Sequence, residues 1–322
     1  MYKLLNMSDF SSLEEIEKNM NFYRERYNFD GFEIIKFTDK NLKELKDNIK
    51  GYHLRFFPCW LDLYRENYKK LYEELKEDKY IKSLCGGLSK KELIDYYKKE
   101  LEIAKGLEVE YIVFHPCNIY IKESFHYNFY YSNKEVLKEV VNFLNEILDD
   151  NKYNFTLLLE NLWWSGLRLD SYEDADFLMK NIKYKNKGFL LDTGHMFNNN
   201  QDIKTIEEGI KYIEENITNL KEYKDYIYGV HLNFSISGDY VKSVSKNYDN
   251  NKSFEELMNE VYFHIQKIDY HDAFNDEKIV EILNKLPLKY LIYEFIAIDS
   301  KELILKIETQ DKAINKFLKS KK

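Results

Sequence analysis

Short apolar runs alternate along this chain with longer stretches in which apolar residues recur three and four positions apart. Two typical runs are Thr156-Leu-Leu-Leu-Glu160 and Gly188-Phe-Leu-Leu-Asp192, each of which ends at a carboxylate. A short, continuous apolar run of this kind is typical of a strand that is buried on both faces of a parallel sheet. Such runs predict eight strands, over residues 2–7, 31–37, 51–57, 111–115, 155–160, 188–192, 227–232 and 290–295. The stretches between them predict helices over residues 13–23, 41–49, 63–75, 89–107, 136–148, 174–182, 203–223 and 301–318.

Eight strands that alternate with helices are the pattern of a (β/α)8 TIM barrel, an α/β fold. Ser12 with Glu15, and Ser89 with Glu92, have the spacing of capping boxes at two of the helix starts. With only 3 Pro and 11 Gly in 322 residues, the chain has little room for linkers, so we expect one domain over residues 1–322. Residues 235–276 are too many for a plain connection, and they predict an insertion between strands seven and eight with an extra helix over 254–268.

Composition narrows the range of partners. The formal net charge of −8 argues against a surface that binds nucleic acid over the whole protein. A basic cleft confined to one region would still be compatible with this net charge. Arginine occurs only five times, so phosphate contacts would fall mainly to lysine or to a metal. Three cysteines without CxxC spacing, no recognisable signal peptide and no apolar run of ~18 residues predict a soluble, cytoplasmic protein without a membrane partner.

Histidines and carboxylates gather where the predicted strands end. They are His53, His115, Glu160, Asp192, His195, His231 and Glu294, with Asp269 and His271 shortly before the last strand. Five of the seven histidines in the chain belong to this set. Because the carboxyl ends of parallel barrel strands meet at one mouth, these groups predict a site for one to three divalent cations, whether Zn, Mn or Mg.

Each of these residues also has a purely structural interpretation. A single strand histidine such as His53 is more often a packed core residue than a ligand. Glu160 and Glu294 differ, because each closes an apolar run and a buried carboxylate is costly without a partner, which a cation would supply. The pair Trp163-Trp164 could form a wall for a sugar ring or could simply pack together, and both alternatives stay open.

The motifs Val-Phe-His115-Pro, Leu-Leu-Leu-Glu160-Asn, Leu-Leu-Asp192-Thr-Gly-His195, Gly-Val-His231-Leu-Asn and Tyr-Glu294-Phe resemble those of the xylose isomerase-like TIM-barrel superfamily. That superfamily includes sugar isomerases, ketose 3-epimerases and the AP endonucleases of the endonuclease IV family (AP endonuclease family 2). The resemblance covers nearly the whole chain. It implies one divalent metal held by Glu160, Asp192, His231 and Glu294, with His195 close by.

The resemblance to the AP endonucleases implies a fuller set for three zinc ions. One ion would be held by His53, His115 and Glu160, a second by Glu160, Asp192, His231 and Glu294, and a third by His195, Asp269 and His271. The sequence departs from that family in three places. The insertion before Asp269 is long, Phe234 stands where an aspartate is expected, and residues 161–166 do not resemble a DNA-facing loop.

Three functions are compatible with these residues. The first is a metal-dependent sugar or sugar-phosphate isomerase or epimerase. In it Glu160 and Glu294 transfer protons and His195 bonds a substrate oxygen, while further substrate contacts come from His53, His115, Trp163, Trp164 and Arg168. The second is a zinc-dependent phosphodiesterase resembling an AP endonuclease. The third is a metal-binding protein without catalysis. We expect the first function, with a small sugar or sugar phosphate as the substrate. Nucleic acid is a disfavoured partner that the sequence does not exclude. The sequence also leaves open whether the protein forms a homo-oligomer.

Overall fold

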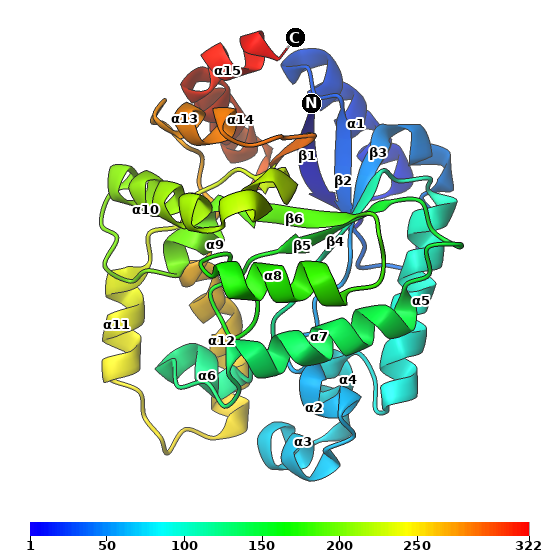
Figure 1. Ribbon diagram of the computed structural model, residues 1–322, viewed down its shortest axis with the longest axis vertical. Coiled ribbons are helices and arrows are strands. Elements are labelled where there is room, and N and C mark those ends of the chain that lie inside the picture. Colours follow the sequence, from blue (N-terminus) through cyan, green and yellow to red (C-terminus); the bar gives the residue numbers. More distant parts are fainter. Residues whose placement is uncertain (322) are drawn as a thin grey trace.

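A closed barrel of eight parallel strands forms the centre of the computed structural model, which describes residues 1–321 (Figure 1). Each strand pairs with the next, and β8 closes the barrel against β1. The strands are β1 (Tyr2–Ser8), β2 (Gly31–Ile35), β3 (Ile49–His53), β4 (Tyr111–Phe114), β5 (Thr156–Glu160), β6 (Lys187–Asp192), β7 (Ile227–His231) and β8 (Tyr290–Tyr293). This arrangement confirms the predicted (β/α)8 barrel.

Helices surround the barrel (Figure 1). They are α1 (Leu13–Tyr27), α2 (Trp60–Tyr64), α3 (Tyr68–Leu75), α4 (Asp78–Cys85), α5 (Lys90–Gly106), α6 (Ile121–His126), α7 (Asn133–Ile147), α8 (Tyr172–Asn181), α9 (Thr193–Asn198), α10 (Ile206–Asn219), α11 (Gly238–Lys246), α12 (Phe254–Ile268), α13 (Ile279–Asn284), α14 (Ser300–Ala313) and α15 (Asn315–Ser320), with 3-10 helices η1 (Lys43–Asn48) and η2 (Lys221–Tyr226). Ser12 and Ser89 accept hydrogen bonds from the backbone amides of Glu15 and Glu92, so the predicted helix starts are confirmed, with only this half of each expected capping box formed. Every helix within residues 1–321 is too short or too polar to cross a bilayer.

Several predicted elements were too long, and the backbone shows why. The expected helix over 63–75 is interrupted by Glu66, whose φ is 56°, and the expected helix over 203–223 ends before Lys221, whose φ is 52°. A left-handed residue cannot continue an α-helix. The expected strand over 51–57 is β3, which starts and ends earlier. The expected helix over 41–49 is the 3-10 helix η1, and the one over 301–318 is divided into α14 and α15.

The expected insertion leaves and re-enters the barrel wall at one point. Phe234 and Asp272 form an antiparallel bridge with two backbone hydrogen bonds of 2.9 Å, which closes the base of the insertion. Within it lie α12, as predicted, and also α11, which the sequence analysis missed. Figure 1 shows both helices beside α6, at one side of the barrel. The bridge returns residues 269–271 to the neighbourhood of β7.

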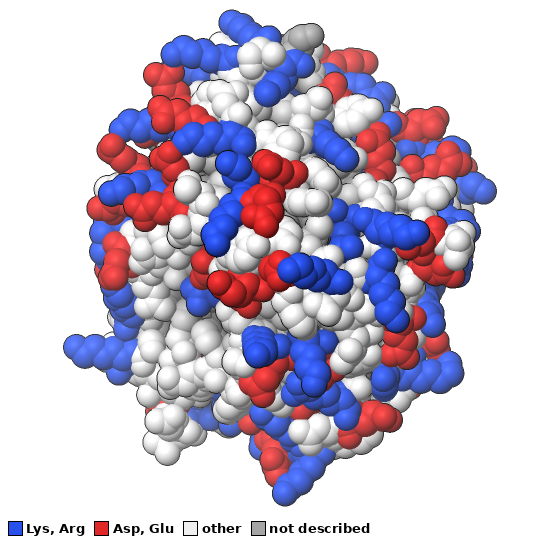
Figure 2. Space-filling model, in the orientation of Figure 1, with Lys and Arg blue, Asp and Glu red and all other residues white. Residues whose placement is uncertain are grey.

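Apolar side chains fill the barrel away from the strands' carboxyl ends. The lumen holds Leu4, Tyr111, Val113, Leu158, Leu190, Tyr290 and Ile292, all buried. A larger apolar cluster packs the helices against the outside of the strands. On the face shown in Figure 2, lysine and arginine side chains are interspersed with aspartate and glutamate, without a broad region of one sign. The apolar lumen therefore lies below the histidines and carboxylates at the carboxyl ends of the strands.

Candidate metal centre

The barrel brings the strand-end residues of the sequence analysis together at one mouth. His53, Glu160, Asp192 and His231 are the last residues of β3, β5, β6 and β7. His115 and Glu294 directly follow β4 and β8. All eight strands run in the same direction around the barrel, so their last side chains converge.

Glu160 lies at the centre of this cluster and is fully buried. Its Oε2 is 2.9 Å from Nε2 of His115 and 3.2 Å from Nε2 of His53. Its Oε1 is 3.2 Å from Nδ1 of His231 and 3.3 Å from Nδ1 of His195. The two carboxylate oxygens thus face two different groups of imidazoles, which is the arrangement of a bridging ligand.

Four overlapping groups of side chains could each hold a cation, because their ligand atoms all lie within 4.8 Å of one another. They are His53, His115 and Glu160; Glu160, Asp192, His231 and Glu294; His53, His231 and Glu294; and Asp192, His195 and His271. The first two groups coincide with two of the three ligand sets that the sequence resemblance implies.

The third implied set is brought together only in part: Asp269 belongs to none of the four groups, but its carboxylate contacts both histidines of that set. Oδ2 of Asp269 is 2.9 Å from Nε2 of His271 and 3.1 Å from Nε2 of His195. His271 has a φ of 43°, and Oγ of Ser235 accepts a hydrogen bond from its backbone amide at 3.2 Å. A left-handed histidine is unfavourable by itself, and such strain is concentrated at functional sites. The base of the insertion therefore places His271 in a costly conformation that directs it toward the cluster.

The hydrogen bonds behind the imidazoles show that the cluster fits a cation. Nδ1 of His53 donates to the carbonyl of Leu54 at 3.0 Å, and Nδ1 of His195 donates to the carbonyl of Asn161 at 2.8 Å. The remaining nitrogen of each ring, Nε2, faces a carboxylate oxygen that can only accept. Two acceptors at this distance require a proton or a metal ion between them, and a bonded rear nitrogen is usual in metal-ligating histidines.

The charges agree with this interpretation. Burial opposes the charged form of His53, but the Glu160, Glu33 and Glu294 carboxylates outweigh it and raise its pKa to about 9. Burial also opposes the charged form of His271, but nearby carboxylates, above all Asp269, outweigh it and raise its pKa to about 9. Burial would raise the pKa of Glu294, but the His231 and His271 imidazoles lower it to about 2. Two members differ, because burial lowers the pKa of His115 and raises that of Asp192 to about 6. His53 and His271 therefore favour a positive charge beside the ionised Glu294, whereas His115 does not.

The sequence analysis missed Glu33, a fully buried carboxylate in the middle of β2. Its Oε1 accepts from Nε2 of His231 at 3.0 Å and from the side-chain amide of Asn6 at 2.6 Å. This leaves Nδ1 of His231 to face Glu160 and Glu294, the latter at 3.0 Å. The available signal was an acidic residue inside the apolar run Gly-Phe-Glu-Ile-Ile, whereas only strand ends had been considered.

Two asparagines next to the cluster were also missed as supporting residues. The Asn161 side chain pairs with the backbone of Asp192 in both directions, at 2.9 and 3.0 Å, and the Asn233 amide donates to Oδ2 of Asp192 at 2.9 Å. A Cβ on Gly194 would lie 2.0 Å from Oδ1 of Asn233. The glycine beside Asp192 therefore makes room for Asn233, which fixes the Asp192 carboxylate.

The other residues predicted to contact substrate are Trp163, Trp164 and Arg168, and they lie in different surroundings. Trp163 and Trp164 are buried, their ring centroids are 4.4 Å apart, and Trp163 lies 5.0 Å from the ring of His195. They pack together, and Trp163 also borders the cluster; a contact of either ring with a sugar stays a prediction. The guanidinium of Arg168 donates to the side chain of Asn199 and pairs with Asp170 at 3.3 Å. Its contact with substrate stays a prediction.

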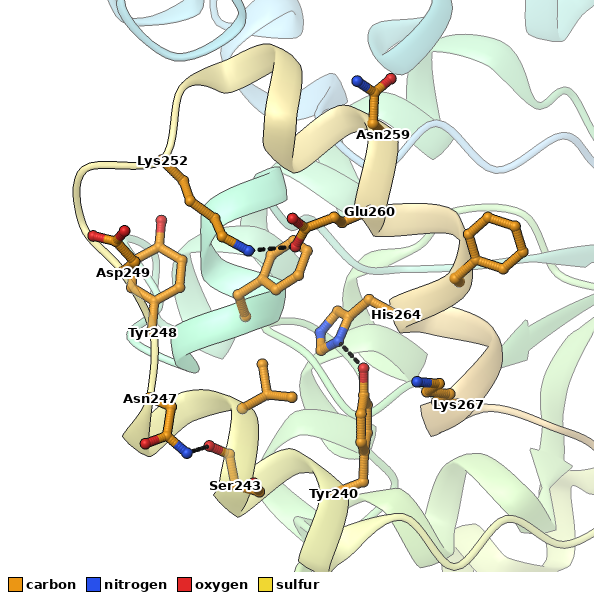
Figure 3. Close-up of a pocket in the computed structure, with 13 residues that line it drawn as sticks. Tyr240, Ser243, Asn247, Tyr248, Asp249, Lys252, Asn259, Glu260, His264 and Lys267 are labelled. Atoms are coloured by element: carbon orange, nitrogen blue, oxygen red, sulfur yellow. Dashed lines mark hydrogen bonds and ion pairs between the residues drawn. The ribbon is translucent and has the colours of Figure 1, made fainter.

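A separate pocket of about 440 Å³ lies between α6, α11 and α12 (Figure 3). His264 points into it from α12, and its Nδ1 is 2.9 Å from the hydroxyl of Tyr240. Its Nε2 donates to the carbonyl of Ser124 in α6 at 2.9 Å. No member of the metal cluster lines this pocket, and we interpret His264 as a structural tie between the three helices.

Comparison with known proteins agrees with the fold. A probable endonuclease 4 from Metamycoplasma arthritidis (strain 158L3-1) is 28% identical over 159 residues, which are 49% of this chain and 52% of that protein, so the match spans about half the length of this curated relative. The structure is similar to a D-tagatose 3-epimerase-like protein (TM-score 0.54, 19% identity, all of both chains covered). It is also similar to the IOLI protein with a bound zinc atom (TM-score 0.55, 14% identity, 98% of this chain and 97% of that one).

These similar proteins carry the names of different enzymes, so they do not determine one reaction. A family model, described as xylose isomerase-like TIM barrel, matches residues 24–274, which is well over half of the chain. The chain therefore belongs to the xylose isomerase-like TIM-barrel family.

Proposed function

We propose that this protein is a metal-dependent phosphodiester hydrolase whose cluster holds up to three divalent cations. This is the alternative of the sequence analysis rather than its first choice. The observation that carries the proposal is the closure of Asp269 and His271 on His195, because those two residues complete the third ligand set. An isomerase that uses one metal has no need of this set.

Divalent cations bound to the cluster would supply Lewis-acid polarisation of a phosphoryl oxygen and a water acidic enough to attack near neutral pH. The chain's own residues arrange this chemistry. Glu160 spans two groups through its two oxygens, and the rear hydrogen bonds of His53 and His195 fix which nitrogen faces inward. The bridge between Phe234 and Asp272 holds the third set against the other two.

Two further observations support hydrolysis. The curated relative that matches half of this chain is named a probable endonuclease 4. The scarcity of arginine leaves recognition of phosphate to metal ions, and nine converging ligands provide for several of them. The net charge of −8 and the interspersed surface charges favour a small or locally recognised phosphodiester over a long polynucleotide track.

A sugar or sugar-phosphate isomerase or epimerase remains the second candidate, because one observation favours it. Glu160 and Glu294, the two proposed proton-transfer residues, lie at the ends of the non-adjacent strands β5 and β8 and meet in one group with Asp192 and His231. The resemblance of the fold to a D-tagatose 3-epimerase-like protein is compatible with this chemistry. In that case His53 and His115 would bind substrate hydroxyls instead of a metal.

Metal content per chain and reaction type separate the two candidates. We expect more than one zinc per chain in protein purified without chelators, and Asp269→Asn should lower this number by about one. Asp272→Asn is the matched control, because Asp272 lies three residues away and, among residues 1–321, its carboxylate bonds the amide of Ala273 and Lys306 and no member of the cluster. Wild-type protein should hydrolyse bis(p-nitrophenyl) phosphate. A single ion per chain, unchanged in Asp269→Asn, together with solvent deuterium entering a ketose, would establish the isomerase instead.

A further inference from the structure

An apolar pocket adjoins the metal cluster and has no role in the proposal so far. It has a volume of about 270 Å³, and its inner end is formed by three residues of the cluster, His115, His195 and Asp269. A group bound in this pocket would therefore be continuous with anything bound at the cluster.

Aromatic side chains form the walls beyond those three residues. Phe56, after β3, places its ring 4.9 Å from that of His115, and Trp163 places its ring 5.0 Å from that of His195. Trp164, in the loop between β5 and α8, and Ile265, in α12, also line the pocket. The apolar surface thus begins where the imidazoles of the cluster end.

The loop that carries both tryptophans is held in a fixed shape. Gly166 has a φ of 139°, and a Cβ there would lie 2.1 Å from the carbonyl of Pro116. Leu162 donates to the carbonyl of Leu167 at 2.9 Å, and the amide of Leu167 donates to Pro116 at 2.9 Å. Loops tied to a neighbouring loop in this way are preformed, so the pocket does not depend on a ligand to open it.

The opposite wall is held as well. Residues 261, 265 and 269 are four apart along α12 and its end, and all three line the pocket. His264 ties the same helix to α6 and α11 through Ser124 and Tyr240, as Figure 3 shows for Tyr240. The helix is therefore anchored while its inner face lines the pocket.

Few polar groups in this lining are available to a ligand. The hydroxyl of Ser124 donates to the carbonyl of Ile121, and the hydroxyl of Tyr120 donates to Asp62. The indole nitrogens of Trp163 and Trp164 are buried without a hydrogen-bond partner. The other unpartnered polar atoms of the lining belong to His115 and Asp269, at the cluster end of the pocket. A sugar ring would lose the hydrogen bonds that its hydroxyls make to water and would regain few of them beyond that end, so the pocket disfavours it.

We infer that the pocket binds a planar, apolar group of the substrate, of the size of one aromatic ring, while the oxygens of the same substrate lie at the metal cluster. This inference rests on the proposed hydrolase and makes its substrate an ester with an aromatic substituent. The two tryptophans and Phe56 provide faces for stacking, and the indole N–H groups can donate to a polar atom at the edge of the ring.

Two non-hydrolysable probes test the inference with the metal-loaded protein. Phenylphosphonate and methylphosphonate share the same head group and differ in the ring. Calorimetry should show phenylphosphonate bound at least ~10-fold more tightly, because the ring would leave water for the pocket. Ile265→Trp, which fills the pocket, should reduce this preference to less than about twofold and leave the affinity for methylphosphonate unchanged; Val261→Phe is a second variant with the same expected result.

Tyr262→Trp is the matched control, because it places an equally bulky residue on the same helix at a side chain that is exposed. It should retain the full preference for the ring. Equal affinity for the two probes in the wild-type protein, or an undiminished preference in both filled variants, would overturn the inference and leave the hydrolase proposal intact. Failure of both probes to bind would refute the phosphoryl site itself and, with it, this inference.

Discussion

Two histidines of this protein are equally buried and equally well hydrogen bonded, but only His195 lies in a site that fits a cation. Its exposed fraction is 4%, and that of His264 is 3%. Each ring donates to a backbone carbonyl, of Asn161 and Ser124 respectively. The second nitrogen of His195 faces the carboxylate of Asp269, whereas that of His264 faces the hydroxyl of Tyr240.

The difference lies in what the partner can do. A hydroxyl can donate to a neutral imidazole, so His264 is satisfied without any charge. A carboxylate cannot donate, and His195 is satisfied only by an additional proton or a cation. The pKa values follow this division. Burial is the largest influence on His264 and lowers its pKa, whereas the Asp192 and Asp269 carboxylates overcome burial and raise the pKa of His195 well above its usual range. The two histidines therefore differ in the group that faces the second ring nitrogen and not in burial. A carboxylate there marks a candidate metal ligand, and a hydroxyl marks a structural histidine.

The largest effect should come from Glu160, which contacts imidazoles on both sides of the cluster. Glu160→Gln removes the charge and leaves an amide that cannot bridge two cations, so we expect metal affinity to fall more than ~100-fold and more than one ion to be lost. Elemental analysis after gel filtration measures this. Glu108→Gln, at an exposed carboxylate paired with Lys46, serves as control and should leave metal content unchanged. A variant that retains all its metal would contradict a central role for Glu160.

A second prediction concerns pH. In the metal-free cluster His53 and His271 have pKa values raised to about 9, so each holds a proton at neutral pH that a metal must displace. Metal affinity should therefore increase from pH 6.5 to 8.5, by about tenfold per pH unit for each proton displaced, and level off above pH 9. Competition with a chromogenic chelator at several pH values measures the slope. A flat profile, after correction for the chelator, would show that the cluster binds no proton in exchange for metal.

Glu33 should have a smaller effect, because it acts on the metal through His231. Glu33→Gln keeps the shape of the side chain and weakens the acceptor behind the imidazole, so we expect metal affinity to fall about tenfold without a change in stoichiometry. The control is Glu100→Gln, since Glu100 is also buried but bonds the Tyr52 hydroxyl and the Arg55 amide. Equal affinities in the two variants would mean that Glu33 is merely a core residue.

The barrel and most of the cluster could be predicted from the sequence because both depend on short-range regularities. Buried parallel strands are apolar throughout, and a polar residue that closes such a strand must lie at the mouth of the barrel. Glu160, Asp192 and His231 follow from this rule. The predicted role of each residue remains to be tested, but their positions in space required only the strand pattern.

The remaining features depend on contacts that no local pattern reveals. Asp269 and His271 reach the cluster because Phe234 pairs with Asp272 across an insertion of nearly forty residues. The breaks at Glu66 and Lys221 are left-handed residues of types with no particular preference for that conformation. Glu33 is different, since an acidic residue inside the apolar run Gly-Phe-Glu-Ile-Ile is visible in the sequence, but it lies in the middle of the strand and so falls outside a rule based on strand ends.

The smallest effect on metal is expected at His264, where the comparison began. His264→Phe keeps the stacking against Phe125, whose ring lies 4.1 Å away, but leaves the Ser124 carbonyl and the Tyr240 hydroxyl without this partner. Metal content should be unchanged, and the free energy of unfolding should fall by about 1–3 kcal/mol at pH 7.5. His195→Phe should show the converse, with loss of metal, so the two variants together test whether the second partner decides the role.

The pH dependence of that destabilisation sharpens the comparison. The folded-state pKa of His264 lies below the ordinary unfolded value of about 6.5, so the unfolded chain binds more protons at low pH. The contribution of His264 to stability is therefore complete above about pH 6.5 and is lost as the pH falls below it. Denaturant unfolding of wild type and His264→Phe should show a difference that narrows from pH 7.5 to pH 5. A difference that instead widened would mean that His264 is protonated in the folded protein, like the histidines of the cluster.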